Sequence, residues 1–150
     1  MTLAAVGSGC VGGVFFAFSG FVMPALAALP DTDGAEAMRS INVRAVRPPL
    51  MLALFGTAAL RVAALVAAVA VDLDGGTRVL LVVGALLYLL GAVGLTVGYH
   101  VPLNDRLAAA DPTAVPQVWI RYRVVWTRWN WLRAAAALAA AAAFIAALQQ

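Results

Sequence analysis

The chain has 150 residues, of which 64% are hydrophobic and only 11% are charged. Soluble domains have roughly 45–50% apolar and about 25% charged residues, and a soluble fold of this size leaves much of its surface in water. The composition therefore excludes a soluble globular protein, a disordered chain and a disulfide scaffold, and it indicates an integral membrane protein. The net charge is +3 and every basic residue is arginine. These charges are few and spread along the chain, so we predict no nucleic-acid partner.

Four apolar segments are long enough to cross a bilayer, which takes about 20 residues. They cover approximately residues 3–29, 48–71, 79–99 and 129–148. We therefore predict an all-α fold, in which residues 1–150 form a single membrane domain, a four-helix bundle embedded in lipid.

The connection between the first two spans, residues 30–47, is predicted to contain a helix from Ala35 to Arg47. On such a helix Met38, Ile41, Asn42 and Ala45 share one face by their i, i+3, i+4 spacing. This pattern is typical of an amphipathic helix that lies in the membrane interface.

The arginines predict the orientation of the bundle. Only Arg78 flanks the short connection between the second and third spans. The long connections, residues 30–47 and 100–128, or their edges carry most of the others: Arg39, Arg44, Arg47, Arg106, Arg121, Arg123, Arg128 and Arg133. By the positive-inside rule, we expect a multi-pass protein of the cell membrane with cytoplasmic long loops and both termini outside.

Two glycine pairs have the GxxxG spacing, Gly9 with Gly13 and Gly94 with Gly98. Small residues at this spacing let two helices approach closely. The pairs predict either packing within the bundle or a glycine-rich face for a homo-oligomer.

Several polar and aromatic residues collect at the cytoplasmic end of the predicted bundle. Trp126, Asn130 and Arg133 share one face of the fourth span by their i, i+4, i+7 spacing. Met23, Asn42, His100 and Asn104 fall at the same depth. Polar groups are costly in hydrocarbon unless they are paired, so the set predicts either a polar pocket or an interfacial anchor with capping amides.

Two other residues have open roles at this stage. His100 is the only side chain that titrates near neutral pH, but its place beside a proline also suits a helix cap. Arg61 lies near the middle of the second span, where it could bind an anionic substrate, contact carbonyls or Ser8, or face a subunit interface. With one histidine, one cysteine and no acid within a span, we predict no metal site.

The chain resembles the anthrone oxygenase family over nearly its whole length. The resemblance rests on segments in a fixed order: GVFFAFS at 13–19, VMP at 22–24, Met38 with Ile41 and Asn42, VPLN at 101–104, and Trp126-Thr127, Trp129-Asn130 and Arg133. The family consists of small four-span membrane proteins, and its fungal members oxidise polyketide anthrones to anthraquinones. Relatives carry asparagine where this chain has His100.

The resemblance implies an oxygenase that acts on an anthrone-like or other lipophilic aromatic substrate with O2 and without a cofactor. His100 would be the base, and Arg133, Asn42, Asn104 and Asn130 would stabilise the oxyanion, while Trp126 and Met23 would stack on the substrate. Two alternatives stay open: a non-catalytic membrane protein that binds a quinone, a lipid or a partner protein, and a haem protein with His100 as axial ligand.

Overall fold

The computed structural model describes all of residues 1–150, and every regular element in it is helical. Four helical stretches are long and apolar enough to cross a membrane, with mean hydropathies of 1.9, 2.1, 2.4 and 1.4 in chain order. They run over Thr2–Ala27, Leu50–Ala70, Gly75–Ala108 and Val115–Ala147. The large side chains on their outer surface are apolar and exposed, such as Leu52 (69%), Val69 (86%) and Leu90 (67%), as expected for a lipid-facing surface. The predicted all-α four-span fold is confirmed.

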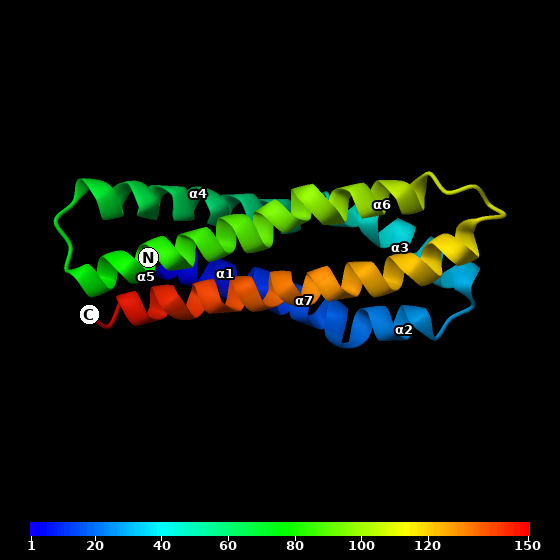
Figure 1. The fold of residues 1–150 in the computed structure, drawn as a ribbon, viewed down its shortest axis with the longest axis horizontal. Helices are drawn as coiled ribbons and strands as arrows, with labels where there is room; N and C mark the ends of the chain where they lie inside the picture. The colour runs from blue at the N-terminus through cyan, green and yellow to red at the C-terminus, as the bar shows by residue number, and fades with distance from the viewer.

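The four spans run antiparallel along the long axis of the molecule (Figure 1). Both termini and the turn between α4 (Leu50–Ala70) and α5 (Gly75–Leu86) lie at one end, which we call the terminal end. The connection between the first span and α3 (Asp31–Ala45) and the one between α6 (Val101–Ala108) and α7 (Val115–Ala147) lie at the other, the loop end, and α3 runs from there back along the bundle towards α4. The loop end holds most of the arginines.

The first and third spans each contain π-helical stretches. In the first span, Phe18–Val22 is π-helical between α1 (Thr2–Ala17) and α2 (Met23–Ala27). In the third, Leu87–Gly94 and Thr96–His100 are π-helical between α5 and α6. Such stretches rearrange the backbone hydrogen bonds and occur often at functional sites.

The helices that carry the third and fourth predicted spans, residues 79–99 and 129–148, extend beyond them on the loop side. The third continues past Tyr99 to Ala108. Pro102 is tolerated because it stands at the start of α6, directly after a π-helical turn, where the regular i→i−4 pattern is already broken. The fourth begins at Val115 as one 33-residue helix.

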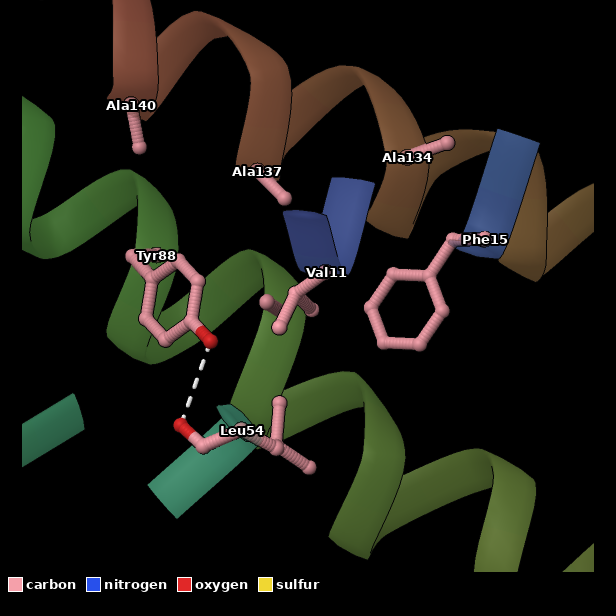
Figure 2. Close-up of a cluster of buried hydrophobic side chains, with 8 residues drawn as sticks. Val11, Phe15, Leu54, Tyr88, Ala134, Ala137 and Ala140 are labelled. Carbon is pink, nitrogen blue, oxygen red and sulfur yellow. Dashed lines mark hydrogen bonds between the residues drawn. The ribbon is translucent and has the colours of Figure 1, made fainter. Parts of the chain in front are cut away.

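Helix α7 is the central element, because it packs against the first and third spans and against α3. Its alanine-rich half presents Ala134, Ala137 and Ala140 to the core, where they meet Val11, Phe15, Leu54 and Tyr88 (Figure 2). The Tyr88 hydroxyl donates a hydrogen bond of 3.1 Å to the carbonyl oxygen of Leu54. Small residues on α7 thus bring α1, α4 and the third span close together.

Glycines allow the closest helix contacts, but they are not the predicted pairs. A Cβ on Gly12 would lie 2.9 Å from the Leu138 side chain, and one on Gly84 would lie 2.8 Å from Phe144. In contrast, a Cβ on Gly9, Gly13 or Gly98 would meet nothing within 4 Å. The alternative that the GxxxG pairs pack within the bundle is therefore wrong, because these glycines lie on outward or open sides of their helices.

Helix α3 confirms a helix in the first long connection, with bounds a few residues earlier than predicted. Its apolar face is turned inward, since Met38 is buried and packs in a cluster with Trp119 and Trp126 of α7. Arg39 donates hydrogen bonds of 2.9 and 2.8 Å to the Leu107 carbonyl, which ties α3 to the end of α6. The location of α3 in a membrane interface stays a prediction.

Two aspartates organise the turns outside the spans. Asp74 caps α5 by accepting a 2.9 Å hydrogen bond from the Thr77 backbone N–H, and Asp111 accepts hydrogen bonds from the hydroxyl and the N–H of Thr113. These hydrogen bonds stabilise the ionised carboxylates, so the pKa of Asp74 and the pKa of Asp111 both lie below the ordinary value.

Candidate functional site

A cavity of about 260 Å³ lies between α1, α3, α4, the third span and α7. Most of its wall is apolar, from side chains such as Phe15, Phe18, Leu54 and Met51. Five of the eight sequence-predicted site residues line it: Asn42, His100, Asn104, Trp126 and Arg133. They lie on three separate stretches of the chain, α3, the third span and α7, and the fold brings them to one cavity. We call it the inner cavity.

Arg133 is the cation of the inner cavity. It is 6% exposed, and its guanidinium carbon lies 3.7 Å from the centre of the Phe15 ring. Its Nε is buried without a hydrogen-bond partner, and the three ion pairs of the chain all involve other arginines. No acidic residue lines the cavity. The cation–π contact compensates only a small part of the desolvation of a buried charge, so the cavity favours an anionic group beside Arg133.

His100 lies opposite two backbone carbonyls. Its Nδ1 is 3.1 Å from the Leu95 oxygen and its Nε2 is 3.3 Å from the Trp126 oxygen. In the neutral ring only one of the two nitrogens carries a proton and donates to its carbonyl, and in the protonated ring both donate. The ring also meets Trp126 edge-on, with the ring centres 5.0 Å apart.

Tyr122 links Asn42 and Asn104 by hydrogen bonds. The sequence did not predict it as a site residue. The Tyr122 hydroxyl donates a 2.7 Å hydrogen bond to Asn104 Oδ1 and accepts a 3.4 Å one from Asn42 Nδ2. This linkage connects α3, α6 and α7 at the edge of the inner cavity. It also orients both amides, because Asn104 Oδ1 is held as an acceptor and its NH2 group stays free to donate.

Trp126 provides the aromatic wall of the inner cavity. It is 6% exposed and packs against Phe18 with ring centres 5.8 Å apart. Its indole Nε1–H is buried and has no hydrogen-bond partner.

Asn130 and Met23 do not line the inner cavity. Asn130 is fully buried and donates 2.7 Å hydrogen bonds from Nδ2 to the Phe15 carbonyl and to Ser19 Oγ. It thereby fixes the part of α1 that carries Phe15, the ring under Arg133. Met23 is buried among Met38, Trp119 and Trp126 in a neighbouring cluster.

Arg61 also lies outside the inner cavity, nearer the terminal end. Its Nη2 donates to Ser8 Oγ, to the Ala4 carbonyl at 3.0 Å and to the Ala140 carbonyl at 3.3 Å. The guanidinium carbon lies 3.5 Å from the centre of the Phe144 ring. The predicted contacts with carbonyls and Ser8 are confirmed, and they join α4 to α1 and α7.

The inner cavity can thus bind an apolar, flat molecule, place a developing negative charge beside Arg133 and the amides, and offer the His100 imidazole to a proton. No cluster of three or more His, Cys, Asp or Glu residues is placed to hold a metal ion. The sequence did not identify Tyr122 and Phe15 as site residues, because they act through other site residues. Tyr122 holds the amides of Asn42 and Asn104, and the Phe15 ring packs on Arg133. The signal that could have found Tyr122 is its i, i+4 spacing from Trp126.

Comparison with known proteins gives one finding. The family model described as anthrone oxygenase matches residues 49–143. This range includes His100, Asn104, Trp126 and Arg133 and leaves out Asn42. No curated protein and no solved structure matches the chain.

Proposed function

The chain belongs to the anthrone oxygenase family, and we propose that it is an oxygenase of the membrane that oxidises a lipophilic, anthrone-like aromatic compound with O2 in the inner cavity. One observation carries the proposal: the buried Arg133 has no anionic partner in the chain and lines a cavity. An unpaired buried cation is costly in hydrocarbon, and an anionic reaction intermediate would offset that cost.

The proposed reaction begins with loss of a proton from the CH2 group of the anthrone. The resulting anion is an aromatic phenolate, and its charge would lie on the oxygen beside Arg133. The electron-rich carbon then combines with O2 and takes up a proton to give a hydroperoxide, which loses water to give the ketone. One O2 supplies one oxygen atom to the product and one to water, so no other oxidant is required and the proposal includes no cofactor.

Each residue of the inner cavity has a role in this scheme. His100 takes the proton on the ring nitrogen that is unprotonated in the neutral imidazole. Arg133 and the amides of Asn42 and Asn104 stabilise the phenolate oxygen. Trp126 packs on the flat ring system, and Asn130 acts as a positioning residue through the Phe15 segment.

The test is O2 uptake by the purified protein with an anthrone as substrate, with the anthraquinone product quantified in parallel. We expect one product molecule per O2 consumed, at a rate well above protein-free autoxidation. His100→Asn should abolish turnover near neutral pH, because it removes the base. Activity that survives with an unchanged pH profile would show that the proton leaves by another route, through water or a substrate phenol.

Two other functions give different results in the same preparation. Tight binding of an anthrone or quinone with no O2 uptake would favour a non-catalytic binding protein. A Soret band in the absorption spectrum would favour haem.

A further inference from the structure

A second, larger hollow lies outside the inner cavity. It is an open groove of about 520 Å³ between the third span and α7, near the loop end. We call it the outer groove. Arg106 and Arg121 line it, and no acidic residue does. Both arginines are exposed, and neither forms one of the three ion pairs.

The outer groove is basic at one end and aromatic and apolar along the rest of its length. Arg106 and Arg121 are at the loop end, whereas Tyr99 and Trp129 lie seven and eight residues away along their helices, on the side of the membrane centre. At 1.5 Å per residue this separation is about 10 Å. The Tyr99 and Trp129 rings stack with their centres 4.1 Å apart. Leu103, Val118 and Val125 supply an apolar floor.

From this arrangement we propose that the outer groove binds an anionic phospholipid, with its phosphate between Arg106 and Arg121 and an acyl chain along the stacked Tyr99 and Trp129. The guanidinium groups are forks that match phosphate oxygens. Basic pockets between membrane helices are known to bind anionic head groups. Aromatic side chains such as Tyr99 and Trp129 favour the level where head groups meet chains. The proposal does not rest on the oxygenase activity.

The outer groove is also open at Gly98, beside the proposed position of the acyl chain. A Cβ on Gly98, which lines the groove, would meet nothing within 4 Å. A larger side chain at this position therefore starts in open space and extends into the groove. This gives a variant that blocks the site and keeps its charge.

The experiment is native mass spectrometry of the purified protein titrated with phosphatidylglycerol or phosphatidylcholine of the same acyl chains. We expect preferential retention of phosphatidylglycerol. The double variant Arg106→Gln/Arg121→Gln should weaken its retention by roughly tenfold or more, since each arginine near an anionic head group contributes several-fold. Gly98→Leu should cause a comparable loss.

The matched control is Arg44→Gln/Arg47→Gln, which removes the same charge from two exposed arginines at and just after the C-terminal end of α3, outside the groove. This control should retain phosphatidylglycerol like the wild type. Equal retention of the two lipids, an equal loss in the control, or unchanged retention in Gly98→Leu would each overturn the proposal. A circular dichroism melt of each variant identifies any loss of fold, and the Gly98 variant keeps the test valid if the arginine variant is unstable.

Discussion

Arg61 and Arg133 are both buried arginines that stack on a phenylalanine ring, yet their surroundings differ. Neither forms an ion pair. Three hydrogen bonds from Arg61 Nη2 join α4 to α1 and α7, whereas Arg133 lines the inner cavity. The same chemical group is therefore structural in one place and available to a ligand in the other. This contrast allows one substitution to be compared at two positions.

We predict that Arg133→Lys lowers the turnover number by about 10²–10³, the cost typical of losing one well-placed oxyanion donor. Lysine keeps the charge but loses the planar fork that can hold a delocalised oxyanion. Arg61→Lys is the control, and it should leave the turnover number per folded protein close to that of the wild type. O2 uptake, normalised to the folded fraction, measures both. Equal losses in the two variants would contradict a catalytic role for Arg133.

The Tyr122 hydroxyl gives a second prediction at the scale of a residue. Tyr122→Phe removes the group that connects Asn42 and Asn104, so both amides lose their orientation. We expect a higher KM and a loss of about 1 kcal/mol in the free energy of unfolding, since Asn104 is only half-buried.

Tyr88→Phe is the matched control for this change. It also removes a buried hydroxyl that donates a hydrogen bond, but its acceptor is the Leu54 backbone carbonyl and not an asparagine of the inner cavity. It should reduce stability with little effect on KM. A KM that rises equally in both variants would indicate a general effect of loosened packing.

The sequence predicts the depth of a site residue better than its direction. Depth follows from the number of residues between a side chain and the end of its span. Five residues that the sequence places at one depth line the same cavity: Asn42, His100, Asn104, Trp126 and Arg133. Direction depends on how helices are rotated against each other. Asn130 is at the right depth, but its amide is directed to the Phe15 carbonyl of α1. The importance of Tyr122 is visible only when α3, α6 and α7 are seen together.

At the scale of the elements, composition and hydropathy are enough to predict four spans, because membrane thickness sets their length. Composition and hydropathy do not predict where the helix of the third span ends. A proline usually ends a helix in sequence-based reasoning, but here the π-helical turn at Thr96–His100 accommodates Pro102 and carries the helix on to Ala108. All three π-helical stretches contact α7, and contacts between segments far apart in the chain cannot be read from one sequence.

The glycines of α1 give a prediction about helix packing. Gly12→Leu should destabilise the bundle, because even a Cβ at this position would press on Leu138 of α7. Overpacking of this kind costs about 1–3 kcal/mol. Gly13→Leu, one residue along, should be nearly neutral, since its side chain enters open space.

The melting temperature in detergent measures this difference, and size-exclusion chromatography with light scattering adds the oligomeric state. If Gly13→Leu changes the oligomeric state, the outward glycine face is a contact between copies of the chain. A lower melting temperature for Gly13→Leu than for Gly12→Leu would contradict the observed helix rotation.

At the scale of the whole molecule, the two ends of the bundle differ in charge and in chemistry. The loop end carries most of the arginines, the mouth of the outer groove and the polar side of the inner cavity. The terminal end carries a short turn with Arg78 and two aspartates, Asp72 and Asp74. An asymmetric bundle of this kind is expected to insert with its arginine-rich end in the cytoplasm. A substrate or lipid would then reach both hollows from the cytoplasmic leaflet.

This orientation is testable with single cysteines in a Cys10→Ala background, because Cys10 is the only native cysteine. Gly75→Cys lies in the turn at the terminal end, where a Cβ meets nothing within 4 Å. In intact cells we expect an impermeant thiol reagent to label it from outside. Thr113→Cys, at the exposed turn between α6 and α7, is the control and should be labelled only after the cells are opened. The reverse pattern would place the arginine-rich end outside, and the positive-inside argument would then be wrong for this chain.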